Sequence, residues 1–265
     1  ETTAVTLNIA GWGNEQDRTP LWNFLHNSKT SIIAIIDHKN TLSGINSVEY
    51  EMHKHWAKVK EKPVFAHADA NNRHIGGISL AIYPCLGRYA QPTEITKDFR
   101  GWGRWTGTSI RGRQKTLYII ATYGPTPNND EKAKESMLWQ KQQNAMKNIP
   151  IIDRQADPRE QYIEDLQQTI SKINKQKNSY GLLLGDMNID QRQNTKHAQQ
   201  WKATMNNTNM TNTVLNRWPG LTQKLHTWKT KLLDHIYISR NSTQYVTAAG
   251  IETGKTAYKN QTIIW

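Results

Sequence analysis

One stretch, Leu182 to Asp190 (LLLGDMNID), constrains the fold of this chain more than any other. Its three consecutive leucines are typical of a short strand buried on both faces, and Gly185 marks the end of that strand. Asp186 and Asn188 follow at once, and their carboxylate and amide oxygens suit a hard cation such as Mg²⁺. Because Gly, Asp and Asn are also ordinary turn residues, this stretch alone fits a plain exit from strand to loop equally well.

The same construction, a core strand that ends in a polar side chain, recurs along the chain. Residues 5–10 alternate apolar and polar side chains as a half-buried strand does, and they contain Asn8. The β-branched run at 31–36 indicates a buried strand, and Asp37 follows it directly. Two further strand patterns have the same kind of ending: residues 115–122, followed by Tyr123, and residues 231–239, which contain Asp234.

Helical patterns are interspersed with these strands, which is typical of an α/β protein. Asp157 is a capping residue followed by proline and, three residues on, by Glu160, so a helix begins there. The apolar stripe of that helix, from Ile163 to Ile173, should pack on the sheet that contains Leu182. The other expected elements are helices at 19–25 (with Pro20 at its first position), 44–60 and 131–147, strands at 75–82 and 261–265, an irregular polar segment at 188–201, and a loop at 205–213.

The charge of the chain favours a polyanionic partner. Its 34 Lys and Arg against 22 Asp and Glu give a net charge of +12 and a pI near 9.7. Nucleic acid is the first candidate and an acidic membrane surface the second, although the basic residues are dispersed. No stretch approaches the apolar length of a membrane span. The single cysteine, Cys85, excludes an internal disulfide and a multi-cysteine zinc site.

Residues 98–105 (DFRGWGRW) are the candidate nucleic-acid-binding loop. In this interpretation Trp102 and Trp105 stack on bases, and Arg100 and Arg104 pair with phosphates. The alternative is a tight turn with its tryptophans packed underneath, and the sequence does not separate the two.

Six motifs in this order resemble the endonuclease/exonuclease/phosphatase superfamily, whose members have the deoxyribonuclease-I-like fold. They are Asn8 in LNIAG, Asp37 in IIDHK, the strand entered through Gly76-Gly77, Tyr123 in TYGP, GDMN at 185–188, and TW followed by LLDHIYIS. Within the superfamily, the succession of DFRGWGRW, TYGP, DPREQYIEDL and LLLGDMN is most similar to the endonuclease domain of non-LTR retrotransposon polyproteins. The similarity spans about Thr6 to the C-terminus.

The resemblance implies a fold and a metal site. The fold would be a single domain over residues 1–265, a four-layer α/β sandwich in which two mixed β-sheets pack face to face with helices outside. The active site would lie where the strand ends gather. Asn8 and Asp37 would help to hold the metal ion, Mg²⁺ or Mn²⁺.

It also implies roles for four further residues. Tyr123 would hydrogen-bond the scissile phosphate, and Asp186 would orient or deprotonate the attacking water. Asn188 would stabilise the charge that develops, and Asp234 would orient a catalytic histidine. These residue types fit phosphodiester hydrolysis, in which a metal polarises the phosphoryl oxygen, donors surround the transition state and a base activates water.

The chain departs from the family pattern at two places. The family has glutamate where Asp37 stands, which withdraws the carboxylate by one methylene. The family also begins its last strand with Ser-Asp-His, and in register this chain has Tyr258, Lys259 and Asn260. Loss of a general acid or base alone costs about 10²- to 10⁴-fold in rate. Lys259 should also repel a metal cation or take its place.

Other histidines offer a weak substitute. His235 follows Asp234 on a strand, so its side chain should point to the opposite face, and His38 has the same relation to Asp37. His74 precedes the glycine-pair strand and could approach the site. Each is more often an exposed or hydrogen-bonded histidine than a catalytic one.

Two functions from different classes remain open. The first is a metal-dependent endonuclease that nicks duplex DNA, and the second is a catalytically degenerate relative that binds nucleic acid or serves as a structural module. Phosphoinositide and sphingomyelin phosphodiesterases share the fold but fit the loop tryptophans less well. If it is of the retrotransposon type, we expect the chain to act in the nucleus, within a larger polyprotein or assembly; a processed or secreted form also fits, because the sequence begins with Glu1.

Overall fold

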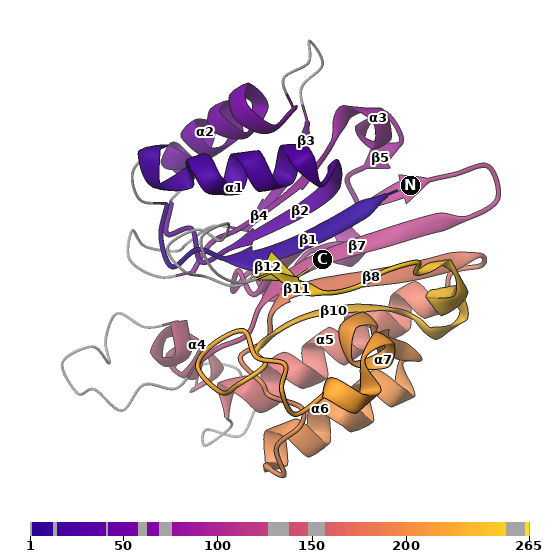
Figure 1. The fold of residues 1–265 in the computed structure, drawn as a ribbon. Helices are drawn as coiled ribbons and strands as arrows, with labels where there is room; N and C mark the ends of the chain where they lie inside the picture. The colour runs from indigo at the N-terminus through magenta and orange to yellow at the C-terminus, as the bar shows by residue number, and fades with distance from the viewer. Residues whose placement is uncertain are drawn as a thin grey trace.

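The computed structural model describes residues 2–12, 15–40, 42–57, 63–68, 76–126, 138–147, 157–252 and 263–264. In this part of the chain, two six-stranded β-sheets pack face to face, and helices cover their outer faces (Figure 1). Each sheet has one parallel pair of strands among antiparallel ones, so both are mixed. The predicted four-layer α/β sandwich is confirmed.

The first sheet has the strand order β11-β12-β1-β2-β4-β3. Its strands are β1 (Thr3–Asn8), β2 (Thr30–Ile36), β3 (Val64–Ala68), β4 (Ile78–Ile82), β11 (Ile251–Glu252) and β12 (Ile263–Ile264). β1 lies between its parallel partner β2 and antiparallel β12, where Thr6 faces Ile264. The outer face is covered by α1 (Glu15–Asn27) and α2 (Leu42–Glu51), and α2 continues as the π-helical turn η1 (Met52–Ala57).

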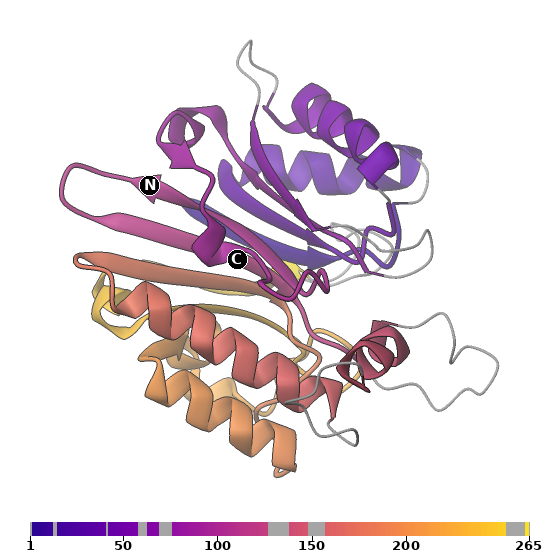
Figure 2. The same ribbon diagram turned by 180° about the vertical axis from the view of Figure 1, so that it is seen from behind.

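The second sheet has the strand order β5-β6-β7-β8-β10-β9. Its strands are β5 (Ala90–Gln91), β6 (Trp105–Arg111), β7 (Thr116–Tyr123), β8 (Ser179–Asp186), β9 (Met210–Asn212) and β10 (Asp234–Ser239). The long helices α5 (Pro158–Asn174) and α6 (Lys196–Asn207) cover its outer face, as Figure 2 shows from behind. The shorter elements are α3 (Pro84–Gly87), α4 (Leu138–Lys147), α7 (Thr213–Arg217), η2 (Glu94–Thr96), η4 (Pro219–Leu221) and η5 (Arg240–Tyr245).

Side-chain alternation along the central strands builds three apolar layers. In β2, Ile32 and Ile36 face the other sheet, while Ile33 and Ile35 pack against α1 and η1. In β8, Leu182 and Leu184 likewise face the other sheet. Leu183 packs instead against the stripe of α5 and against α6. Because both faces of these strands are covered, their sequences read as continuous apolar runs.

Strand register brings the predicted site residues to one edge of the molecule. Tyr123 at the end of β7 pairs with Asp186 at the end of parallel β8. Asp186 in turn lies opposite Asp234, the first residue of antiparallel β10. In the other sheet, Asn8 ends β1 beside the end of β2, and Asp37 comes next.

Three local expectations are wrong. The first helix begins at Glu15, so Pro20 lies inside α1 rather than at its first position. The segment expected to be irregular until Trp201 becomes helical at Lys196, because Thr195 accepts a hydrogen bond from the N–H of Ala198 and caps α6. Most of the expected loop at 205–213 belongs instead to the end of α6 and to β9. The polar composition of α6 hides its narrow apolar stripe, which consists of Ala198, Trp201 and Met205.

The remaining expected elements occur with shifted ends. Asp157 caps α5 by accepting a hydrogen bond from the N–H of Arg159, as predicted. Residues 58–60, 69–75 and 131–137, which the expected elements include in part, lie outside the described residues. None of the helices within the described ranges is long and apolar enough to cross a membrane.

Candidate active site

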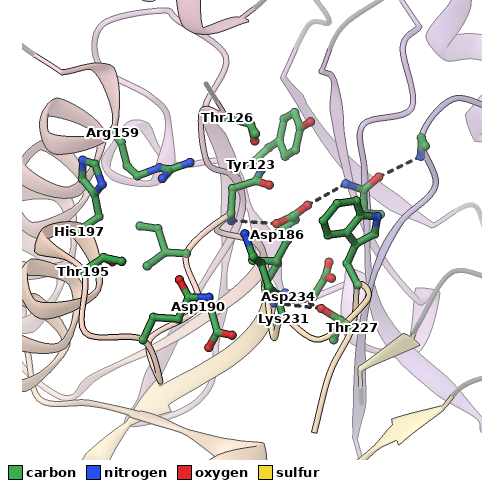
Figure 3. Close-up of a pocket in the computed structure, with 17 residues that line it drawn as sticks. Tyr123, Thr126, Arg159, Asp186, Asp190, Thr195, His197, Thr227, Lys231 and Asp234 are labelled. Carbon is green, nitrogen blue, oxygen red and sulfur yellow. Dashed lines mark hydrogen bonds between the residues drawn. The ribbon is translucent and has the colours of Figure 1, made fainter. Parts of the chain in front are cut away.

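A cleft of about 570 Å³ opens at the edge where the strand ends meet, and both sheets contribute to its walls. Five of the six residues predicted to form the site line it: Asn8, Tyr123, Asp186, Asn188 and Asp234. The sixth, Asp37, lies close enough that its charge raises the pKa of Tyr123. Residues from four strand ends and from the turn after β8 therefore line one cleft (Figure 3), and Asp37 lies beside it.

Asp186 is the centre of the hydrogen-bond network. The side-chain amide of Asn8 donates to its Oδ2 at 2.8 Å, and the backbone N–H of Asn188 donates to its Oδ1 at 2.8 Å (Figure 3). Burial raises the pKa of Asp186, although both bonds and the nearby charge of Arg159 oppose the rise. The carboxylate is thus rigidly oriented and has an increased affinity for a proton.

Two neighbouring residues owe their positions to left-handed backbone. Asn188 has a φ of 52° and Asp37 a φ of 56°, a region that Asn and Asp enter more readily than most residues. The side-chain amide of Asn188 donates to the carbonyl of Gly124 at 2.8 Å, which fixes it at the cleft wall. The Oδ1 atom of Asp37 accepts the N–H of Gly76 at 2.8 Å. Both strands therefore turn sharply just beyond their ends and hold these side chains at the site.

Asp37 is a buried carboxylate whose negative charge is only partly offset by its neighbours. Burial raises its pKa to about 6, against the lowering effects of Lys39 and of the Gly76 hydrogen bond, and Asp186 raises it further. The ammonium of Lys39 is 3.8 Å from Oδ2 and partly exposed, so it neutralises the carboxylate incompletely. Asp37 thus adds to the excess of negative charge behind the cleft.

Asp234 carries an unsatisfied oxygen. Its Oδ1 atom is buried and has no hydrogen-bond partner among the described residues. Burial, and then the charge of Asp186, raise its pKa well above the ordinary value. Tyr258, Lys259 and Asn260, at the place of the predicted terminal triplet, lie outside the described residues.

These carboxylates fit a hard divalent cation. Asp37, Asp186 and Asp234 are all buried, and each has a raised pKa, which means that the folded chain disfavours three negative charges at this place. A cation removes that penalty, and oxygen ligands of this kind are the ones that Mg²⁺ and Mn²⁺ prefer. By the resemblance, Asn8 and Asp37 would hold the ion; in the described part of the chain, the three acidic or histidine side chains whose ligand atoms lie within 4.8 Å of one another are Asp157, Glu160 and His197.

Tyr123 is suited to donate a hydrogen bond. Burial raises its pKa well above the ordinary value, and the charges of Asp37 and Asp186 raise it further. Its hydroxyl therefore keeps its proton at all ordinary pH values and can donate to an anionic oxygen in the cleft.

The two histidines that follow site aspartates are core residues. Burial lowers the pKa of His38 to about 4, and its ring packs against Gly77, where an added Cβ would lie 2.5 Å from Cε1. Burial also lowers the pKa of His235 to about 4; its Nε2 donates to the carbonyl of Ile189 at 3.0 Å. Both rings are neutral and turned away from the cleft, as strand geometry predicted. His74 lies outside the described residues.

The sequence analysis missed several residues of the cleft. His197 lines it, and Asp157 is 2.9 Å from its Nε2. Together with Glu160, these two side chains place ligand atoms within 4.8 Å of one another, a spacing that a metal ion could bridge, although Lys196 pairs with Glu160 at 2.5 Å. No motif marks His197, because its partner lies 40 positions earlier in the chain.

A second group of missed residues forms another part of the cleft wall. Trp228 and Lys231 line the cleft and face each other across an isolated β-bridge. Trp228 is 48 % exposed, and the ammonium of Lys229 lies 4.4 Å from its ring centroid. The sequence did mark this place, because Thr227 and Trp228 are the TW pair of the last motif. Thr227 also accepts a hydrogen bond from the N–H of Asp234 at 3.2 Å.

The structure corrects the interpretation of two residues of the predicted nucleic-acid-binding loop, Arg104 and Trp105. Arg104 is fully buried, 2.8 Å from Asp98 and 2.9 Å from Asp165, and Trp105 is a core residue. Trp102 packs its ring against the Arg104 guanidinium at 4.7 Å. This part of the segment is therefore a turn held by ion pairs with Trp105 packed beneath it, as the alternative had it.

Arg100 and Trp102 are less deeply enclosed. The Arg100 guanidinium makes a two-point ion pair with Asp165, with distances of 2.5 and 3.0 Å. Contact of Arg100 and Trp102 with nucleic acid stays a prediction.

Comparisons with known proteins identify the fold. No family model and no curated protein sequence matches the chain. An AP endonuclease from Archaeoglobus fulgidus aligns with a TM-score of 0.67 and 12 % identity over 100 % of this chain and 98 % of that one. AP endonuclease LMAP from Leishmania major aligns with a TM-score of 0.69 and 12 % identity over 98 % and 85 %. The endonuclease domain of TRAS1, a telomere-specific non-LTR retrotransposon, aligns with a TM-score of 0.59 and 10 % identity over 98 % and 94 %.

Proposed function

Because the chain has the deoxyribonuclease-I-like fold, we propose that it is a metal-dependent phosphodiesterase that cleaves DNA. The observation that carries the proposal is the convergence of Asn8, Tyr123, Asp186, Asn188 and Asp234 in one cleft, with Asp37 beside it. Similar structures described as AP endonucleases and as a retrotransposon endonuclease domain support DNA as the substrate class. The net charge of +12 supports it as well.

The residues of the cleft divide the chemical work. Asp186, held by Asn8 and Asn188, orients the attacking water and accepts its proton, a task that its raised pKa favours. Tyr123 donates its hydroxyl proton in a hydrogen bond to a non-bridging oxygen of the scissile phosphate. The side chain of Asn188 lies at the wall where negative charge develops in the transition state.

A Mg²⁺ or Mn²⁺ ion bound near Asn8 and Asp37 would polarise the phosphoryl oxygen and neutralise charge in the transition state. Asp37 is shorter than the glutamate of the family by one methylene. Its left-handed backbone and its hydrogen bond with Gly76 set where the carboxylate sits, and they offer a way to offset that difference.

The experiment is a nicking assay on supercoiled plasmid with Mg²⁺, Mn²⁺ or EDTA. We expect nicking that requires the metal and that falls to background in Asp186→Asn, which keeps the size of the side chain but removes its charge, its basicity and one of its two acceptor oxygens. Asp190→Asn is the matched control for specificity, because Asp190 also lines the cleft but is engaged by Arg192 at 2.6 Å. Cleavage that survives Asp186→Asn would contradict the assignment.

A second candidate, a non-catalytic nucleic-acid-binding module of the same fold, is favoured by the terminal triplet. Lys259 and Asn260 stand where the family has Asp and His, and Asp234 has an oxygen without a partner in the described structure. If this candidate is right, the wild-type chain shows no nicking above the Asp186→Asn background. Lys259→Asp combined with Asn260→His should then restore partial activity. A retrotransposon-type role within a polyprotein, and action in the nucleus, remain part of the proposal.

A further inference from the structure

Arg159 differs from the other arginines that are largely enclosed by the fold. Each of those has a carboxylate partner: Arg18 with Glu51 at 2.5 Å, Arg100 with Asp165 at 2.5 Å, Arg104 with Asp98 at 2.8 Å, and Arg192 with Asp190 at 2.6 Å. Arg159 is partly buried and lines the cleft, yet no ion pair joins it to any described residue. A partly buried charge without a counter-ion is costly, which makes an anionic ligand the expected partner.

The guanidinium of Arg159 is fixed in place by other contacts. Its Nε and Nη2 atoms donate to the carbonyl of Pro125 at 3.3 and 3.2 Å. The ring of Trp139 lies 5.9 Å from the guanidinium carbon. The remaining nitrogen, Nη1, has no acceptor in the described part of the chain. One edge of the guanidinium is thus held by protein, and N–H groups remain for a ligand.

The carboxylates nearest to Arg159 are engaged elsewhere. Asp157 accepts the backbone N–H of Arg159 at 2.7 Å and is 2.9 Å from the imidazole of His197. Glu160 pairs with Lys196, and Asp186 accepts from Asn8 and Asn188. These charges attract Arg159 at longer range, but none forms the direct ion pair that would occupy its free N–H groups.

Arg159 lies near enough for its charge to lower the pKa of Asp186, but no hydrogen bond or ion pair joins these two residues in the described structure. In Figure 3, Arg159 and His197 lie together on one side of Asp186. Asn8, which donates to Asp186, comes from the first sheet. The attacked phosphate must sit beside Asp186 and the metal residues, so an anion at Arg159 is a different group. In a nucleic acid, the anion nearest to one phosphate is the next phosphate along the strand.

We propose that Arg159 binds the phosphate adjacent to the scissile one, so that the cleft holds two consecutive phosphates of one strand. This inference rests on the proposed function, because it takes a nucleic-acid strand as the ligand. It makes Arg159 a substrate-positioning residue: its hydrogen bonds set which bond is presented to Asp186. The cleft then selects a polymer over an isolated phosphodiester.

Kinetics with two substrates test the proposal. Arg159→Gln removes the charge and keeps a donor for Pro125, Arg159→Lys keeps the charge, and Arg113→Met removes a charge from the exposed turn between β6 and β7. For an oligonucleotide, Arg159→Gln should raise KM about 10-fold or more, the effect of losing a charge-assisted hydrogen bond. Arg159→Lys should recover part of this loss. For bis(p-nitrophenyl) phosphate, which has a single phosphate, Arg159→Gln should lose much less activity than it loses on the oligonucleotide, because only the effect of the Arg159 charge on Asp186 then remains. An equal loss on both substrates would overturn the proposal, because Arg159 would then act on the scissile phosphate itself.

Binding in EDTA tests the subsite even if no variant cleaves DNA. Fluorescence anisotropy with a short labelled duplex should give an approximately 10-fold higher Kd for Arg159→Gln than for wild type or Arg113→Met. The slope of log Kd against log salt concentration should also decrease by about 0.9, the value for one phosphate contact. An unchanged Kd and slope, with the thermal stability of wild type, would overturn the subsite. Absence of cleavage by the wild type would instead count against the proposed function alone.

Discussion

Replacing Asp37 by asparagine should stabilise the metal-free protein. The pKa of this carboxyl rises from 3.8 to about 6 on folding, mainly through burial. The folded chain keeps the proton up to about pH 6, whereas the unfolded chain releases it near pH 3.8, so stability falls as pH rises through this window. One pKa unit corresponds to about 1.4 kcal/mol, so the ionised carboxylate costs about 3 kcal/mol at pH 7. Asp37→Asn removes this cost and keeps an acceptor for the N–H of Gly76.

Thermal unfolding in EDTA measures the effect. For a chain of this size, about 3 kcal/mol corresponds to an increase in Tm of roughly 6 to 12 °C at pH 7. The gain should be about half as large, in kcal/mol, at pH 5 and should vanish below pH 3.8, where both states of the wild type are protonated. A Tm at pH 7 that is equal to or below that of the wild type would refute the reasoning.

Asp190→Asn is the matched control with the opposite sign. Burial alone would raise the pKa of Asp190, but hydrogen bonds from Arg192 and Leu232 and the charge of Arg192 lower it overall. Its carboxylate therefore stabilises the fold, and the substitution should decrease Tm. Added Mg²⁺ provides a second contrast: it should raise the Tm of the wild type by mass action and should have little effect on Asp37→Asn.

Three further outcomes follow from the structure. Arg104→Met leaves Asp98 and Asp165 buried without their shared partner. It should lower the free energy of unfolding, measured with urea, by about 3 to 5 kcal/mol, and it should change the free energy of DNA binding far less. Gly185→Ala should abolish soluble expression, because Gly185 has a φ of 149° and an added Cβ would lie 2.0 Å from the carbonyl oxygen of Thr122. Affinity for duplex DNA should weaken steeply between low and moderate salt, and a flat salt dependence would remove nucleic acid as the partner.

The sequence was sufficient to predict those site residues that directly follow or end a recognisable strand. The run of leucines before Asp186 indicated a buried strand, and the register of β7, β8 and β10 then placed Asp186 in one row with Tyr123 and Asp234. Asn8 and Asp37 followed the same logic in the other sheet. In each case, the strand and its polar ending lie within a few residues of each other.

The parts that could not be predicted depend on distant partners. Arg104 and Trp105 have the composition of a nucleic-acid-binding loop, and the fold shows that the Arg104 charge is instead satisfied by Asp98 of the same segment and by Asp165 from α5. His197 gains its place in the cleft from Asp157, the capping residue of another helix. Arg159 gave no signal, since an arginine in a helix start reads as an ordinary surface residue until its lack of a counter-ion is visible.

The pairing of β1 with β12 bears on how the chain is synthesised. Thr6 in β1 pairs with Ile264 in β12, which is translated long after it. Until those last residues emerge, one edge of β1 lacks its strand neighbour and presents free backbone N–H and C=O groups. We therefore expect the first sheet to be completed only after β12 has been translated, and nascent chains stalled before Ile264 to be prone to aggregation and dependent on chaperones.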